Sequence, residues 1–151
     1  MSKGKLFLIP APISINSPFG WDVKTLSIIT EMRYFIVEEI RTARKLLRRV
    51  IPSFPIDECT FQILNEHTPP ADIPTMLQPM MKGHDMGLMS EGGIPCIADP
   101  GAVLVWMAHC KNIQVIPLPG SSSIFLALAA SGFNGQNFCF HGYLPVEKIA
   151  R

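Results

Sequence analysis

The chain of 151 residues is long enough to bury the core of one domain, and its 48% apolar and 17% charged residues are typical of a globular protein. A formal net charge of +1 excludes a protein that binds polyanions over its whole surface, so a nucleic-acid surface would have to be a local patch. The four cysteines share no C-x-x-C spacing, which argues against a metal site and a disulfide framework and favours a reducing compartment.

The apolar runs of the chain are too short to enter a membrane. Lysines precede the run at residues 6–9, but Pro10 and Pro12 interrupt it and no small-residue cleavage site follows. The longest later run, residues 124–130, falls well short of the ~20 residues that span a bilayer. We therefore expect a soluble, cytoplasmic protein that binds neither a membrane nor a metal ion.

Predicted strands and helices alternate along the chain. Continuous apolar runs, of the kind buried in parallel sheets, predict strands at residues 5–9, 34–37, 60–64, 85–89 and 113–118. Helices are predicted at residues 23–32, 40–50, 73–82, 99–110 and 124–131. The alternation favours an α/β fold with a mostly parallel five-stranded sheet flanked by helices.

Individual residues mark where these helices should begin and end. Asp99 and Pro100 suit the start of the fourth helix, as an N-cap and as a proline at the first helical position. The serines after Gly120 can cap the last helix, and Gly132 supplies the left-handed residue that ends it. Pro79 should kink the third helix or end it early.

A glycine loop follows the fourth predicted strand, where residues 90–93 read Ser-Glu-Gly-Gly. Adjacent glycines remove the Cβ atoms that would keep a ligand away from the backbone. In an open α/β sheet, ligands bind at the loops beyond the carboxyl ends of the strands, where the polar residues 65–67 are also expected. No G-x-G-x-x-G or Walker sequence is present, so an ordinary Rossmann or P-loop site is disfavoured. A simple connecting loop is the alternative.

The second predicted helix carries five cations at the spacing of one helical face, opposite an apolar face. Such a stripe is commonly a solvated surface. Five cations without an acid among them repel one another, however, and a phosphate backbone would offset that cost. We therefore consider an RNA-binding surface made of Arg41, Arg44, Lys45, Arg48 and Arg49.

Several motifs keep one order and spacing across nearly the whole chain. They are Glu38-Glu39-Ile40-Arg41, Glu66-His67, residues 90–95 with 99–101, residues 117–122, and residues 130–132 with 140–145. Together they resemble the tetrapyrrole methylase family, the class III S-adenosylmethionine-dependent methyltransferases. The most similar branch is the bacterial 16S rRNA (cytidine-2′-O)-methyltransferase.

The resemblance implies a two-domain enzyme, usually a homodimer, with the cofactor in the cleft between the domains. Residues 1–144 would form the N-terminal domain, and residues 145–151 would begin the linker to a C-terminal domain. The cofactor would be S-adenosyl-L-methionine and the partner rRNA or the small ribosomal subunit. By analogy, the residues that touch the cofactor would be Gly92, Gly93, Ile94, Pro95, Ser122 and Ser123.

If the methyl acceptor is a ribose hydroxyl, a side chain must take its proton. The candidates are polar residues placed at strand ends, each of which could instead be a structural carboxylate or its partner. They are Glu39, Glu66, His67 and Glu91.

Two alternatives to RNA methylation remain open at this point. A tetrapyrrole or other small-molecule methylase would share the fold, although it would not need the basic helix. A non-catalytic family member could act as a binding or dimerisation module. That view is supported by the first turn, where Ala11-Pro12-Ile13-Ser14-Ile15 stands in place of the family's Thr-Pro-Ile-Gly-Asn.

Overall fold

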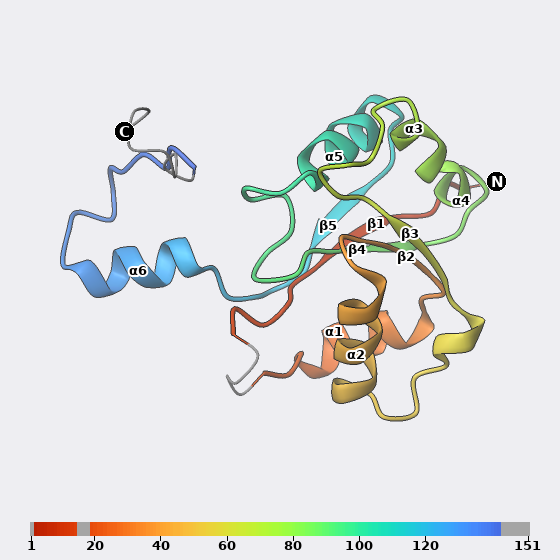
Figure 1. Cartoon of the computed structure of the whole chain (residues 1–151), viewed down its shortest axis with the longest axis horizontal. Coiled ribbons are helices and arrows are strands. Elements are labelled where there is room, and N and C mark those ends of the chain that lie inside the picture. The colour runs from red at the N-terminus through yellow and green to blue at the C-terminus, as the bar shows by residue number, and fades with distance from the viewer. Residues whose placement is uncertain (1, 15–18, 143–151) are drawn as a thin grey trace.

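Five apolar segments pair into one parallel sheet in the computed structural model, which describes residues 2–14 and 19–142 (Figure 1). The strands run in the order β3-β2-β4-β1-β5, and every pairing is parallel. This confirms the predicted α/β class. The strands are β1 (Leu6–Ile9), β2 (Tyr34–Val37), β3 (Thr60–Ile63), β4 (Met86–Met89) and β5 (Val115–Pro117).

Helices cover both faces of the sheet, because side chains of successive strand residues point to opposite sides (Figure 1). On one face, Phe7 and Phe35 pack in a cluster with residues of α1 (Val23–Glu31) and α2 (Ile40–Val50). On the other face, Leu8 and Ile36 pack with residues of α3, α4 and α5. These three helices span Ile73–Met76, Gln78–Met81 and Gly101–Cys110. The central strands β1 and β4 are consequently buried along their whole length.

The predicted third helix, residues 73–82, is interrupted, as expected from Pro79. The interruption lies at Leu77, which follows α3 and precedes α4, so the structure has two short helices in place of one kinked helix. A proline has no backbone N–H and its ring clashes with the carbonyl of the previous turn, so it is tolerated only in the first turn. Pro74 and Pro79 each occupy such a position, which requires two short helices.

Carboxylates bond to the first turns of α1, α2 and α5. Asp22 accepts a hydrogen bond from the Thr25 backbone N–H at 2.8 Å. Asp99 accepts one from Gly101 N–H and one from Cys96 N–H, both at 2.7 Å, so it ties the first residue of α5 to the loop before it. The predicted cap is wrong by one residue, because Pro100, and not Asp99, is the N-cap of α5. The predicted serine cap of α6 (Ser123–Ser131) is wrong in its chemistry, since Ser122 makes no side-chain cap bond. Gly132 ends α6 in the left-handed conformation, as predicted, with φ of 73°.

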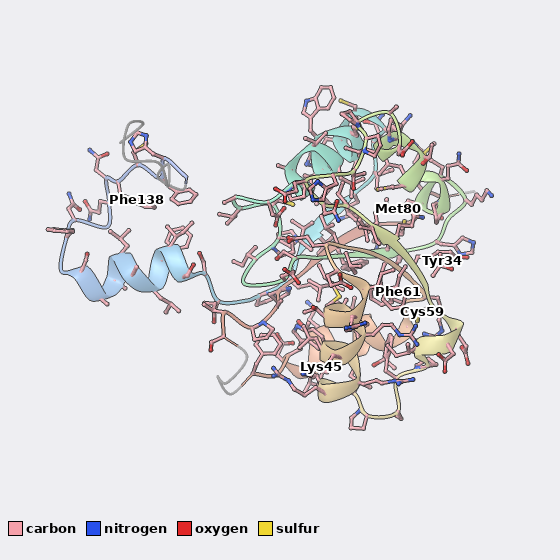
Figure 2. All side chains as sticks on the ribbon, viewed as in Figure 1. Tyr34, Lys45, Cys59, Phe61, Met80 and Phe138 are labelled. Carbon is pink, nitrogen blue, oxygen red and sulfur yellow. The ribbon has the colours of Figure 1, made fainter. Side chains whose placement is uncertain are left out.

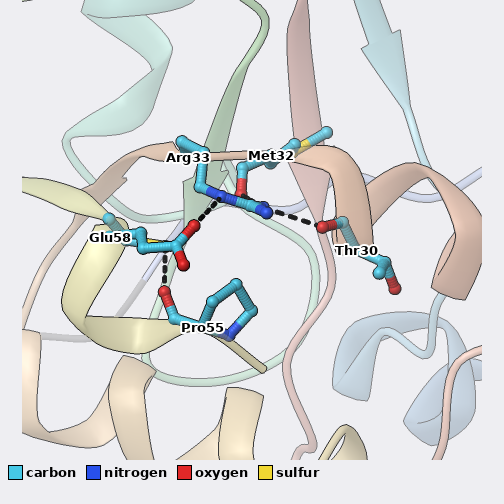
Figure 3. Close-up of polar contacts among 6 residues, drawn as sticks. Thr30, Met32, Arg33, Pro55 and Glu58 are labelled. Atoms are coloured by element: carbon cyan, nitrogen blue, oxygen red, sulfur yellow. Dashed lines mark hydrogen bonds and ion pairs between the residues drawn. The ribbon is translucent and has the colours of Figure 1, made fainter. Parts of the chain in front are cut away.

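A short 3-10 helix, η1 (Ile56–Glu58), lies beside α2 and is tied to the end of α1 by Arg33. Arg33 Nε donates to Glu58 Oε2 at 3.2 Å, and its Nη1 donates to the Thr30 and Met32 carbonyls at 2.9 Å each (Figure 3). These contacts hold the neighbouring residue Asp57 at the surface of α2, where it meets two cations of that helix.

The last helix, α6, stands away from the sheet and its covering helices (Figure 1). None of its residues is buried, and Phe125 is 55% exposed although the helix is almost wholly apolar. The ring of Phe125 contacts that of Phe138, which lies beside α6 and far from the sheet (Figure 2). The predicted domain boundary after residue 144 lies outside the described residues. Within the described part of the chain, no helix is both long and apolar enough to cross a bilayer.

Candidate functional site

The loops that follow β1 and β4 are joined at the carboxyl edge of the sheet. Ala11 and Gly93 form an isolated antiparallel bridge, in which each N–H donates to the other's carbonyl at 2.8 and 3.1 Å. Gly93 is buried and has φ of 73°, a conformation that L side chains rarely adopt. A glycine at this position therefore allows the backbone conformation with which the two loops join.

A cavity of about 310 Å³ opens between this junction and α2. Its apolar lining comes from both loops, from the strand ends and from the inner side of the helix. The residues concerned include Ile13, Val37, Leu46 and Met89. Its remaining lining consists largely of charged side chains, with three carboxylates and three cations.

The carboxylates of the cavity are Glu38, Glu39 and Glu91. Glu38 directly follows β2 and is the least exposed of the three. Burial, together with the negative charges of Asp99 and Glu91, raises the pKa of Glu38 above its usual value, although a hydrogen bond from the Glu91 backbone opposes the shift. Glu91 in turn accepts a hydrogen bond from Thr42 Oγ1 at 3.3 Å. The cavity thus holds a carboxylate with more than ordinary proton affinity.

The predicted basic stripe of α2 divides into two rows. Arg44 Nη2 lies 3.0 Å from Asp57 Oδ1, and Arg48 Nη2 lies 3.8 Å from Asp57 Oδ2. The other row lines the cavity; Lys45, one of its members, is labelled on α2 in Figure 2. This row consists of Arg41, Lys45 and Arg49, at i, i+4 and i+8. The stripe itself contains no acidic residue, and Asp57 on η1 supplies one to the row formed by Arg44 and Arg48.

The residues predicted to touch the cofactor lie close together but outside the cavity, whose lining takes only Ser90 and Glu91 from the glycine loop. Gly92 is exposed, Ile94 half-buried and Pro95 buried. A Cβ built on Gly93 would lie 3.6 Å from the Ser121 carbonyl oxygen, so the loops after β4 and β5 are neighbours. The turn beyond that oxygen contains Ser122, which is buried, and Ser123, which is exposed.

The four predicted proton acceptors are not brought together. Glu91 and Glu39 line the cavity, and Glu39 Oε1 also caps α2 by accepting from Arg41 N–H at 2.9 Å. Glu66 and His67 form a pair at 3.5 Å whose side chains are 85% and 84% exposed, beyond the edge strand β3. Sequence reasoning overlooked Glu38. Its signal was its position as the first residue after a buried strand at the ligand-binding edge.

The segment between the glycine loop and α5 contains two residues in the left-handed region, Cys96 with φ of 73° and Ala98 with φ of 58°. The Asp99 carboxylate holds this segment through its bond to Cys96 N–H. Burial, and secondarily the Asp99 charge, raises the pKa of the Cys96 thiol to about 12, so this thiol is protonated at neutral pH and is a poor nucleophile. No cluster of metal-ligating side chains occurs among residues 2–14 and 19–142.

The described domain is a parallel α/β unit whose candidate site, formed by a glycine loop, carboxylates and a cationic helix, lies at the carboxyl edge of the sheet. No protein-family model matches the chain. It is, however, similar over nearly its full length to proteins named ribosomal RNA small subunit methyltransferase I.

The protein from Buchnera aphidicola is 32% identical over 148 residues, which are 98% of this chain and 50% of the relative. The Pseudomonas aeruginosa protein is 30% identical over 151 residues, or 100% of this chain and 51% of the relative. The Streptococcus pyogenes serotype M1 protein is 32% identical over 145 residues, or 95% and 48%. The chain spans about half the length of these relatives. They confirm the resemblance to the rRNA methyltransferase branch that the motifs predicted.

Proposed function

We propose that the protein acts in S-adenosylmethionine-dependent methylation of ribosomal RNA in the cytoplasm, with a ribose 2′-hydroxyl as the acceptor. The observation that carries this proposal is the cavity at the carboxyl edge of the sheet, whose lining combines cations of α2, carboxylates and apolar side chains. Cations attract the phosphates of RNA, and a carboxylate can accept the proton of a hydroxyl. The names of the relatives support the same substrate class.

The cofactor would lie against the glycine loop and the turn after β5. Gly92 is exposed there, and a Cβ built on it would be only in ordinary contact with the Pro12 carbonyl oxygen at 3.6 Å, so the backbone is open to a ligand. Gly93 would contribute indirectly, since both its backbone groups are bonded to Ala11. Ile94, Pro95, Ser122 and Ser123 complete the surface that we assign to the cofactor. When bound, S-adenosylmethionine supplies an activated methyl group.

The protein's part in the reaction is to position the acceptor and remove its proton. We assign proton removal to Glu38, with Glu91 beside it. A raised pKa makes a carboxylate a stronger base, and burial, followed by the charges of Asp99 and Glu91, raises the pKa of Glu38. Glu39 is already engaged as the cap of α2, and Glu66 and His67 lie apart from the cavity. We therefore place these last three outside the chemical step.

RNA is preferred over a small tetrapyrrole because of Arg41 and Lys45. These cations lie at the opening of a cavity that already contains carboxylates, and a porphyrinoid, which carries carboxylates of its own, would gain little there. A phosphate chain that passes outside the cavity would use the cations without approaching the acids.

We also propose that a second copy of the chain covers α6. In the described part of the chain the apolar side chains of α6, among them Phe125 and Leu126 at 55% and 58% exposed, lie at the surface, and an apolar surface of this kind suits an interface between copies. Sedimentation at increasing protein concentration tests this proposal. The proposal would be contradicted if the protein sedimented as a monomer at all concentrations and a Phe125→Ser variant sedimented in the same way.

The proposed activity is tested by incubating small ribosomal subunits with the protein and methyl-labelled S-adenosylmethionine. Nuclease digestion of the RNA then locates the label on a base or a ribose. The Glu38→Gln variant should bind RNA normally and transfer little label. Label on a small tetrapyrrole and none on RNA would favour the small-molecule alternative. Absence of both RNA and cofactor binding would favour a non-catalytic module.

A further inference from the structure

We propose that the cavity beside α2 receives a single nucleotide that is unstacked from its neighbours, with its sugar and base inside and its phosphates outside. This inference rests on the proposed function, since it takes the ligand to be RNA. It goes further by defining the RNA that can be bound: a single strand, or a strand from which one nucleotide has been flipped.

The size of the cavity supports one nucleotide. Its volume of about 310 Å³ lies at the lower end of the range of ~300–1,000 Å³ found for small-molecule pockets. Two whole nucleosides, whether paired or stacked, would need more space than one. Enzymes that act on an individual nucleotide commonly extrude it from the stack for the same reason.

The charges of the cavity determine which end of the nucleotide enters. Glu38, Glu39 and Glu91 repel a phosphate, and the raised pKa of Glu38 reflects how strongly negative charge is already disfavoured at this position. The cations Arg41 and Lys45 are exposed on α2, and phosphates bound to them would lie at the rim. The ribose hydroxyls, which can donate to carboxylates, then point inward.

The lining also indicates how the base is held. Ile13, Val37, Leu46 and Met89 offer aliphatic surface to the face of a base, and none of the described residues that line the cavity is aromatic. Aromatic stacking, which is worth ~1–3 kcal/mol per base, is therefore not available from this lining. The affinity should depend on the phosphate contacts, and the preference for one base over another should be small.

The test uses the 151-residue chain and a short single-stranded RNA that carries one 2-aminopurine, whose fluorescence rises when it leaves the stack. We expect binding to increase the fluorescence several-fold. A fully paired duplex of the same sequence should bind about tenfold more weakly, because a nucleotide must first be extruded from it.

A variant that fills the cavity separates this site from general RNA binding. Thr42 is exposed on α2 and lines the cavity, so Thr42→Phe should reduce the affinity for the single strand about tenfold and abolish the fluorescence rise. Thr42→Val removes the hydroxyl that donates to Glu91 but adds no bulk, and it should behave as the wild type. Thr30→Phe, at an exposed position on α1 outside the cavity lining, is the matched control for bulk.

The outcomes distinguish this inference from the proposed function. If the RNA binds but the fluorescence does not rise, or if Thr42→Phe binds as the wild type does, the nucleotide cavity is refuted and RNA binding stands. If neither single-stranded nor paired RNA binds, both proposals fail. Equal affinity for single strand and duplex would also refute the cavity, because it would show that no nucleotide has to leave its stack.

Discussion

Asp57 on η1 lies 3.0 Å from Arg44 on α2, and its second oxygen lies 3.8 Å from Arg48. Because of this one carboxylate, the cations of α2 fall into two rows with different surroundings. Asp57 contacts one row, Arg44 and Arg48, and the other row, Arg41, Lys45 and Arg49, lines the cavity. Five cations of one helix should therefore contribute unequally to RNA binding.

The double variant Arg41→Gln with Lys45→Gln should weaken RNA binding and reduce its salt dependence. For each phosphate of a single strand that the variant no longer neutralises, the slope of log affinity against log salt should fall by about 0.7. Fluorescence anisotropy at several salt concentrations measures both effects. The matched control, Arg44→Gln with Arg48→Gln, should change the slope less because Asp57 already holds these cations. Equal effects of the two double variants would show that the rows do not differ.

Asp57→Asn should strengthen RNA binding. The substitution frees Arg44 and Arg48 from their partner, so α2 gains positive charge that can meet phosphates. Stability should change by less than about 1 kcal/mol, because ion pairs this exposed contribute little. Anisotropy and thermal melting check the two parts. A loss of RNA affinity in a folded variant would mean that Asp57 organises the binding surface.

Gly93→Ala should destabilise the fold by about 1–2 kcal/mol, because φ of 73° is strained for any residue with a Cβ. Space is not the reason, since the nearest atom to an added Cβ is 3.6 Å away. Gly92→Ala is the control, because Gly92 has no positive φ and an equally open surrounding. Denaturant unfolding of the three proteins gives the comparison. A Gly93→Ala variant as stable as Gly92→Ala would be evidence against a strained junction.

Glu38→Gln should make the protein more stable than the wild type at neutral pH. The pKa of Glu38 in the folded state is raised, so the folded state binds its proton more tightly than the unfolded state does. The resulting stabilisation is complete below the unfolded pKa and is lost as the pH rises through the folded pKa. The two proteins should therefore have equal stability in acid, diverge as the pH rises from the unfolded to the folded pKa of Glu38, and differ by a constant amount above it, as measured by thermal melting across pH. A difference that is the same at every pH, acid included, would exclude titration of Glu38 as its cause.

The chain should bind S-adenosylmethionine weakly on its own. Of the residues assigned to the cofactor, Gly92 and Ser123 are exposed, and none of the six lines the main cavity. A ligand that lies on an open surface buries too little area for tight binding. Titration calorimetry should give a dissociation constant well above the low-micromolar range. A low-micromolar value would mean that the described loops already form a complete site.

Local signals in the sequence were sufficient for the strands and for most helix ends. The run Tyr34–Val37 is apolar because both faces of β2 are covered, and Gly132 ends α6 because the residue there has a positive φ. The role of Asp57 was not predictable, since it depends on η1 packing beside α2. Glu38 was overlooked for a similar reason: its raised pKa comes first from its burial and then from the charges of Asp99 and Glu91, and only the fold produces either. Local sequence patterns predict helices and strands, but they do not predict interactions between charged residues that lie on different elements.

The order of the strands has a consequence for synthesis of the chain. Leu6 on β1 pairs with Met86 and Val115, so the first of these five strands to leave the ribosome has both neighbours about a hundred residues away. At translation rates of ~5–20 residues per second, β1 would wait roughly 5–20 s for its last partner. During that time an apolar segment with unpaired backbone groups is open to chaperones and to other nascent chains. The pair formed by β2 and β3, which are close in sequence, can associate much earlier and is the natural place for folding to begin.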